Sequence, residues 1–303
     1  MPLEKLTQLD NYATPPESST LFSRLLPSFA HYTRQLLIVI KAGLLAGRGA
    51  YTSEEWIGSS RATVRSLEQT GTRFFVDGLE HIRALKEPAV FIGNHMSTLE
   101  TFVLPCIVEP FRPVTFVTKA SLLKYPFFGK VLASRQPIVV GRVNPRDDLT
   151  TMLREGEKRL AQGVSVIVFP QSTRSFCFDL TAFNSIGVKL ARRTGAPIIP
   201  VAVKTDVWSM GRFLKDIGPI IPSRDVHFKF GPPIRVEGNG KAEHDQVCAF
   251  ISASLKEWGV DTIPALGPGQ TKPALSEGAG AAADGQAGQS ERPAQAQPEE
   301  FSA

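Results

Sequence analysis

The segment at residues 88–100 reads PAVFIGNHMSTLE, and its pattern indicates a strand that turns into a helix. Residues 89–92 are apolar and bounded by Pro and Gly, which predicts a buried strand. His95 follows soon after, so it lies where that strand ends. Ser97 and Glu100 form the Ser-x-x-Glu pattern of a capping box, which predicts that a helix begins here. The segment therefore predicts a strand–turn–helix unit with a histidine in its turn.

The same alternation of strands and helices extends on both sides of this segment. Strands are predicted at residues 73–76, 89–92, 114–118, 137–140, 164–169, 198–203 and 227–230. Helices are predicted at residues 28–48, 53–68, 79–85, 99–108, 145–162, 184–193 and 243–258. Strands that are apolar on both faces and separated by helices favour an α/β fold. We expect a mixed, mostly parallel central sheet flanked by helices and preceded by an amphipathic two-helix segment.

Composition divides the chain into four regions. Residues 1–20 are polar and carry no signal-peptide pattern, so we expect a disordered N-terminus. Residues 21–70 hold the two helices, and residues 71–263 hold the α/β domain. Residues 264–303 are rich in Gly, Ala, Gln, Pro and Ser without a structural period, which predicts a disordered tail.

The charge balance favours anionic partners. The chain carries a net charge of +5, and the tail holds more acidic than basic residues, so the preceding body is more basic still. Phosphorylated small molecules and anionic lipid headgroups fit such a body. Nucleic acid has little support, because no binding module is recognisable and the basic residues are spread out. The 3 cysteines are far apart, and neither HExxH nor paired CxxC occurs, so we predict no metal and no cofactor.

The helix at residues 28–48 is amphipathic. It places large apolar residues near one face, with Arg34 and Lys41 on another. No apolar stretch reaches the roughly 20 residues that a membrane-spanning helix needs. The helix could lie in a bilayer interface or pack on the protein's own core, and its pattern alone favours the core. The apolar residues are Phe29, Leu36, Leu37, Ile40 and Leu44.

Four polar residues each follow a different predicted strand. In open α/β sheets, ligands bind outside the carboxyl ends of the strands. We therefore expect one shared cleft. A single Arg or Lys is usually a solvated surface charge, and it is the common position at strand ends that indicates an anion site. The four residues are His95, Lys119, Arg142 and Arg174.

The spacing of His95 and Glu100 restricts their chemistry. Five residues along a continuous helix point about 140° apart, so the two side chains can meet only across a bend. There the carboxylate could fix the imidazole tautomer while the other ring nitrogen takes a proton from an alcohol. Glu100 could instead close the capping box on Ser97, and both roles stay open. No G-x-S-x-G elbow occurs, which favours direct attack by a substrate hydroxyl on a thioester.

Four short motifs carry a resemblance. NHMSTLE at residues 94–100, PIVVGR at 137–142, FPQSTRS at 169–175 and APIIPVAV at 196–203 resemble, in order and approximate spacing, the four motifs of the glycerolipid acyltransferase family typified by 1-acylglycerol-3-phosphate acyltransferase. The similarity covers roughly residues 73–234. The basic amphipathic N-terminal helices are similar to that family's membrane-docking pair.

The resemblance implies an enzyme of phospholipid biosynthesis. It would move a fatty acyl group from acyl-CoA or acyl carrier protein to a hydroxyl of a lysolipid, 1-acylglycerol-3-phosphate above all. It would act as a peripheral or monotopic protein on the cytoplasmic face of the cell membrane. His95 would be the base and Glu100 its orienting acid. The implied substrate-binding residues are Lys119, Arg142, Gln171, Ser172, Thr173 and Arg174.

The motifs also depart from the family's usual pattern. Glu100 stands where the family usually has Asp, and Gln171 with Ser172 replaces Glu-Gly. Gln loses the charge, and Ser cannot adopt a positive φ as cheaply as Gly. These departures motivate an alternative, a membrane-docked lysolipid-binding relative that has lost catalysis.

Overall fold

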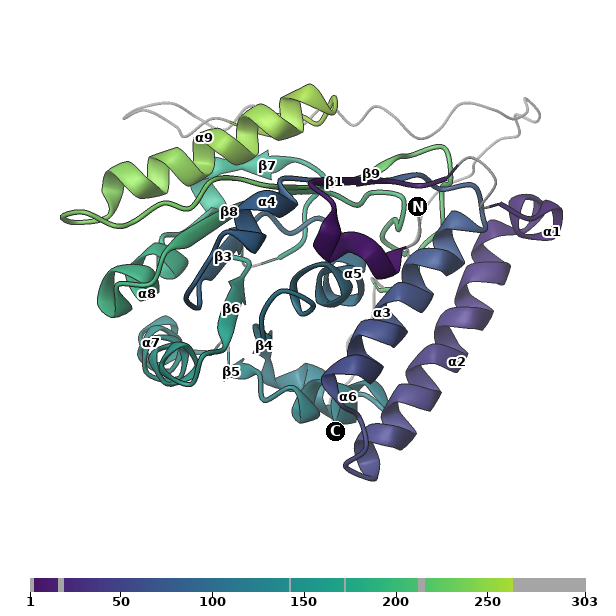
Figure 1. Ribbon diagram of the computed structural model, residues 1–303, viewed down its shortest axis with the longest axis horizontal. Helices are drawn as coiled ribbons and strands as arrows, with labels where there is room; N and C mark the ends of the chain where they lie inside the picture. The colour runs from purple at the N-terminus through teal and green to yellow at the C-terminus, as the bar shows by residue number, and fades with distance from the viewer. Residues whose placement is uncertain (1–2, 16–18, 142, 172, 212–215, 264–303) are drawn as a thin grey trace, which may run out of the picture. The chain divides into compact units, whose positions relative to one another are not determined.

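The computed structural model describes residues 3–15, 19–141, 143–171, 173–211 and 216–263 (Figure 1). Its central feature is an eight-stranded sheet of order β1-β2-β9-β8-β3-β6-β4-β5. A further pair of short parallel strands joins β7 and β10. The strands are β1 Asn11–Ala13, β2 Phe74–Asp77, β3 Val90–Gly93, β4 Val114–Lys119, β5 Ile138–Val140, β6 Ser165–Val168, β7 Phe178–Asp179, β8 Ile198–Lys204, β9 Val226–Phe230 and β10 Thr262–Ile263.

The sheet is mixed and mostly parallel, which confirms the predicted fold class. Strands β3, β6, β4, β5 and β8 all run the same way, so their carboxyl ends meet at one edge. Within the described sheet, only the β8–β9 and β1–β2 pairs are antiparallel.

The helices are α1 Leu21–Leu25, α2 Pro27–Gly47, α3 Ser53–Glu68, α4 Leu79–Arg83, α5 Leu99–Val108, α6 Phe128–Ser134, α7 Pro145–Ala161, α8 Ile186–Thr194 and α9 Lys241–Glu257, with short 3-10 helices η1 Leu3–Gln8, η2 Ala120–Lys124 and η3 Leu180–Ala182.

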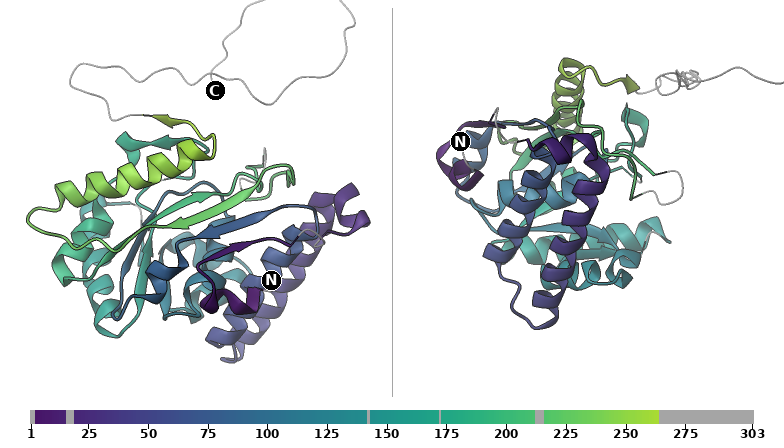
Figure 2. Two further views of the ribbon diagram at one scale, coloured as in Figure 1. Left: turned by 45° about the horizontal axis from the view of Figure 1, so that its top comes forward. Right: turned by 90° about the vertical axis from the view of Figure 1, so that its right-hand side faces the viewer.

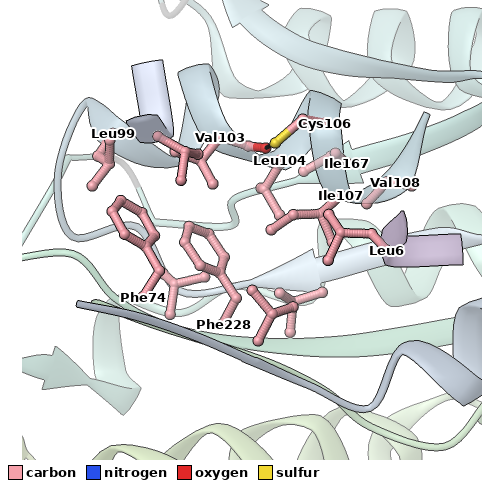
Figure 3. Close-up of a cluster of buried hydrophobic side chains, with 14 of the residues drawn as sticks. Leu6, Phe74, Leu99, Val103, Leu104, Cys106, Ile107, Val108, Ile167 and Phe228 are labelled. Carbon is pink, nitrogen blue, oxygen red and sulfur yellow. Dashed lines mark hydrogen bonds between the residues drawn. The ribbon is translucent and has the colours of Figure 1, made fainter. Parts of the chain in front are cut away.

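Two hydrophobic clusters lie on opposite faces of the sheet. Successive residues of β3 alternate between them, because neighbouring side chains of a strand point to opposite faces. Phe91 belongs to the cluster covered by α3, α4, α5 and α6, whereas Val90 and Ile92 belong to the cluster covered by α7, α8 and α9. Figure 3 shows the first cluster, in which α5 lies over Phe74 and Phe228. Burial on both faces explains why the central strands read as continuous apolar runs.

The N-terminal segment differs from the predicted disorder of residues 1–20. Leu3–Gln8 forms η1, and β1 pairs with the edge strand β2. Leu6 is fully buried, and the buried hydroxyl of Tyr12 donates to Glu68 Oε1 at 2.5 Å. Burial, together with Glu68, raises the pKa of Tyr12. The segment is polar on average, but a few of its apolar residues are buried in the core, which explains the difference. Residues 1–2 and 16–18 lie outside the described part.

Helices α2 and α3 pack side by side (Figure 2). Their contact includes a buried polar seam, in which His31 Nδ1 lies 3.0 Å from Ser66 Oγ and Thr63 donates to Gln35 at 3.0 Å. The His31 ring also makes an edge contact with Trp208 at 4.9 Å between centroids. Burial, with a smaller effect from Arg34, lowers the pKa of His31 to about 3.

This buried histidine predicts acid sensitivity of the fold. An unfolded histidine titrates near pH 6.5, so between pH 6.5 and 3 the unfolded chain binds more protons and stability falls as the pH falls. From pH 7 to pH 5 this one group should cost about 2 kcal/mol. We expect His31→Gln to remove that part of the pH dependence in urea unfolding at the two pH values. The partly exposed His81, changed to Gln, is the control, and parallel curves for wild type and His31→Gln would contradict the prediction.

Gly78, which alone joins β2 to α4, should not tolerate a larger residue. Its φ is +80°, and a Cβ there would overlap the carbonyl oxygen of Phe230. We expect Gly78→Ala to lower the free energy of unfolding by about 3 kcal/mol or more, because both strain and backbone displacement are imposed. Gly49 is the matched control: its φ is +70°, but a Cβ would meet nothing within 4 Å. A Gly49→Ala variant should therefore lose only about 1 kcal/mol by the same urea titration.

Among the described helices, none has both the length and the apolar character required to cross a membrane. Residues 264–303, predicted to be a disordered tail, lie outside the described part.

Candidate active site

The turn after β3 is fixed to the neighbouring strand by Asn94. Its side-chain amide donates to the carbonyl of Val203 at 2.8 Å and accepts from the Val203 amide at 2.9 Å. The side chain thus copies a strand's hydrogen-bonding pattern one residue beyond β3. Because Asn94 is buried, this pairing holds the following residue, His95, at the carboxyl edge of the sheet.

The position of Glu100 is compatible with both roles that the sequence left open. Its Oε1 closes the capping box, accepting from the Ser97 amide at 2.8 Å, and Oε2 faces His95 Nδ1 at 3.4 Å. The Glu100 side chain is fully buried, whereas the His95 side chain is 20% exposed. The 3.4 Å contact is longer than a standard hydrogen bond, as catalytic pairs often are before substrate binds.

Further donors hold the carboxylate. Oε1 also accepts from the Met96 amide at 2.9 Å and from the Thr205 hydroxyl at 2.5 Å. Thr205 in turn accepts from Ser97 Oγ at 3.0 Å. Thr205 directly follows β8, so two strand ends share one buried network. Glu100 is therefore held by more hydrogen bonds than the partly exposed ring that it faces.

An aromatic stack supports the histidine. The His95 ring lies on Phe169, with centroids 4.6 Å apart and planes 13° apart. Phe169 is itself followed by Phe116 at 6.5 Å. The stack covers one face of the imidazole with apolar surface, so water has limited access to it.

The segment after β6 wraps around the backbone of His95. Gln171 Oε1 accepts from the His95 amide at 2.6 Å, and the Ser175 amide donates to the His95 carbonyl at 3.0 Å. Gln171 is buried at 3% exposure. This neutral side chain supplies the acceptor that the backbone requires. Of the residues assigned to substrate binding from the sequence, Gln171 is thus placed to position His95.

Arg174 reaches the same turn from the other side. Its Nη2 lies 2.6 Å from Asp216 Oδ1, and its Nη1 donates to Thr98 Oγ1. Its side chain is 18% exposed. Thr98 is only two residues from Glu100, so the structure brings the guanidinium close to the His–Glu pair.

The other predicted residues are less closely gathered. Thr173 is exposed in the segment that follows β6, and Lys119 is exposed at the end of β4. Within the described residues, neither makes a hydrogen bond or ion pair with the other predicted residues. Arg142 and Ser172 lie outside the described residues.

Sequence reasoning missed several residues of this site. Asn94 and Thr98 stand inside the opening segment and could have been suspected from their position. Thr205 and Asp216 come from more than a hundred residues later in the chain, and no local pattern marks them. Phe169 lies in a predicted strand and opens the FPQSTRS motif, but neither feature predicts that its ring stacks on His95.

A narrow apolar pocket, with a cavity volume of about 40 Å³, lies near the site. Its wall includes Phe116, which links it to His95 through Phe169. The floor includes Arg135, whose guanidinium lies 5.4 Å from the ring centroids of both Tyr51 and Trp56. The remaining lining comes mostly from α2, α3, α5 and α6.

The arrangement therefore combines a histidine beside a buried acid, an arginine suited to an anion, and an apolar pocket. A histidine so placed can accept a proton from an alcohol. A guanidinium can bind a phosphate through parallel hydrogen bonds. Within the described part of the chain, no group of acidic, histidine and cysteine side chains forms a metal site.

Comparison with known proteins agrees with this chemistry. Residues 73–204 match the family model described as Acyltransferase. The chain is 31% identical over 203 residues to a 1-acyl-sn-glycerol-3-phosphate acyltransferase of Pseudomonas aeruginosa, covering 67% of this chain and 73% of that protein. A protein of the same name from Saccharomyces cerevisiae is 30% identical over 192 residues, which cover 58% of this chain and 61% of the yeast protein.

A solved structure shows the same fold. The crystal structure of the 1-acyl-sn-glycerophosphate (LPA) acyltransferase from Thermotoga maritima superposes with a TM-score of 0.62 at 19% identity, covering 78% of this chain and 97% of that one. The Pseudomonas protein is 31% identical to this chain, and the match covers 73% of its length. The family model, the four motifs and the shared fold agree with it, so the chain belongs to the acyltransferase family.

Proposed function

We propose that the protein transfers a fatty acyl group from an acyl thioester to the free hydroxyl of 1-acylglycerol-3-phosphate. The observation that carries the proposal is the His95–Glu100 pair, at 3.4 Å, on the same turn that Arg174 contacts through Thr98. The relatives' names support the reaction and the acceptor. The paired side chains and the apolar pocket favour catalysis over lysolipid binding alone.

The reaction follows from the position of the pair. The acceptor hydroxyl gives its proton to His95 as its oxygen attacks the thioester carbonyl carbon. Glu100 keeps the proton of the other ring nitrogen in place and stabilises the imidazolium. Collapse of the tetrahedral intermediate breaks the carbon–sulfur bond, and the departing thiolate takes the proton from His95. The products are a diacyl lipid and the free thiol of coenzyme A or of acyl carrier protein.

Substrate binding uses charge and apolar surface. Arg174 binds the acceptor's phosphate, and the motifs assign Arg142, Ser172 and Thr173 to the same substrate site. Lys119 is added because it follows a neighbouring strand, not because it belongs to a motif. The exposed surface of the pocket beside Phe116 is almost entirely apolar, which suits an acyl chain, but the cavity of about 40 Å³ must widen to admit one.

The outer faces of α1 and α2 support docking on a membrane surface. Leu21 is 78% exposed and Leu25 is 71% exposed, and six further large apolar side chains on α1, α2 and the link between them are about half exposed or more. A surface of this kind fits a bilayer interface better than water. We place the protein as a peripheral protein on the cytoplasmic face of the cell membrane. The six are Phe22, Leu26, Phe29, Leu36, Leu37 and Leu44.

Charging this surface should release the protein from lipid. We expect Leu36→Glu/Leu37→Glu to weaken co-sedimentation with anionic phospholipid vesicles at least about tenfold, because two leucines no longer enter the interface. Ala161→Glu/Gln162→Glu, at the exposed end of α7, makes the same change in net charge and should bind as wild type does. Equal loss in both variants would mean that overall charge, not this face, determines binding.

A competition among acceptors tests the proposed function. Purified protein is given an equimolar mixture of 1-acylglycerol-3-phosphate, 1-acylglycerophosphocholine and monoacylglycerol, with acyl-CoA or acyl carrier protein as donor. Mass spectrometry should detect the diacyl phosphate first, and Arg174→Ala should lose that preference. A preference that persists without Arg174, or a faster-forming product from another acceptor, would contradict the acceptor assignment.

A further inference from the structure

Arg174 already has an anionic partner within the chain. Asp216 Oδ1 lies 2.6 Å from Nη2 and also accepts from the Thr98 hydroxyl at 3.2 Å. The hydroxyl and the guanidinium thus converge on one carboxylate oxygen. Carboxylate and phosphate use the same donors of an arginine fork, so an acceptor phosphate bound there would compete with Asp216.

The backbone of Asp216 is held in place. Trp208 Nε1 donates to the Asp216 carbonyl at 3.0 Å, and Tyr32 of α2 donates to the Gly218 carbonyl at 2.5 Å. The Ile220 amide donates to Ser28, also on α2, at 3.0 Å. The backbone is therefore anchored at Asp216 and over the residues that follow it, up to Ile220. The Asp216 side chain, in contrast, is 38% exposed and can turn towards water.

We propose that Asp216 is a displaceable counter-ion of Arg174: its carboxylate occupies the anion position in the free enzyme, leaves when a phosphate binds, and returns as the phosphate departs. This inference rests on the proposed function, in which Arg174 contacts the acceptor phosphate. Because the Asp216 side chain is 38% exposed, its carboxylate can move into water, and a phosphate dianion can take its place at Arg174.

Such a counter-ion would help the diacyl phosphate product to leave Arg174. Acyl transfer leaves the phosphate untouched, so acceptor and product hold Arg174 equally well. A fixed arginine without an internal partner would retain the product. Asp216 lies next to Arg174, so its carboxylate can pair again with the guanidinium. This competition weakens the complexes with acceptor and with product by the same factor.

Equilibrium binding tests the proposal without turnover. Wild-type protein and Asp216→Asn are titrated calorimetrically, in the absence of donor, with 1-acylglycerol-3-phosphate and with the corresponding diacyl phosphate. We expect Asp216→Asn to bind both about fivefold more tightly, while binding of monoacylglycerol, which lacks the phosphate, stays unchanged. Asp216→Glu, which keeps the charge, should restore affinities towards the wild-type values.

The controls separate this role from a structural one. Asp225→Asn removes a carboxylate from a different arginine pair, that with Arg73, and should bind all three lipids as wild type does. If Asp216 served to hold Arg174 in place, Asp216→Asn would bind the phosphates more weakly, which would overturn the proposal. Unchanged phosphate affinity, or an equal gain for monoacylglycerol, would overturn it as well.

Failure of the proposed function has a different signature. If Arg174→Ala binds the phosphates as tightly as wild type, Arg174 is not their contact, and the counter-ion role fails with it. If wild-type protein yields no diacyl product with any donor, the acyl transfer itself fails, whereas the titrations still report on Asp216.

Discussion

His95→Ala should lower the rate of acyl transfer by about 10²–10⁴-fold, the usual contribution of a general base. The histidine receives the hydroxyl proton in the account given above, and no other histidine contacts Glu100 among the described residues. The fold should be nearly unaffected, because the ring's packing on Phe169 is worth about 1 kcal/mol and the backbone of residue 95 keeps its bond to Gln171. Initial rates by thiol release and urea unfolding check both parts.

The control for this variant is His81→Ala, on the short helix α4. It removes an imidazole that is likewise partly exposed, and it should retain the wild-type rate. A His95→Ala enzyme that turns over within about twofold of wild type would show that another group accepts the proton.

Glu100→Gln should inactivate the enzyme to a similar extent with little loss of stability. The amide oxygen can still accept from Met96, Ser97 and Thr205, as Oε1 does now. The amide nitrogen would then donate to His95 Nδ1, which moves the ring proton to the other nitrogen. That nitrogen can no longer accept the hydroxyl proton, so we expect a loss of about 10²–10⁴-fold.

Glu100→Ala provides the contrast. It leaves two buried amides and the Thr205 hydroxyl without their acceptor, and it should cost about 3 kcal/mol in unfolding free energy as well as activity. If Glu100→Gln kept full activity while Glu100→Ala lost stability, Glu100 would be a capping residue only.

The fold could be predicted because its signals are local. Segments such as VIVF at residues 166–169 are apolar on both faces, and Gly163 and Gly195 end helices at a positive φ. The order of strands in the sheet could not be deduced, since it depends on contacts between distant segments. The short strand β1 was missed because its few apolar residues lie in a polar stretch.

The site, like the fold, combines residues that local patterns predict with residues that only distant contacts bring in. His95, Glu100 and Arg174 lie in recognisable motifs, and the structure brings them to one turn. Thr205 and Asp216 have no motif, and they join the site only because β8 neighbours β3 and the following loop is tied to α2. The sequence also left Glu100 with two alternative roles. Oε1 accepts from the turn amides, while Oε2, 3.1 Å from the Ser97 amide, also faces His95, and only the structure reveals that geometry.

The most direct test of the account is product formation by the purified wild-type protein. The protein is incubated with 1-acylglycerol-3-phosphate and with acyl-CoA or acyl carrier protein, and diacyl phosphate and free thiol are quantified together by mass spectrometry. We expect both products in equal amounts, and their loss in His95→Ala. A folded wild-type protein that binds the lysolipid but forms no diacyl phosphate from either donor would contradict it, and would identify a lipid-binding relative whose chemistry is gone.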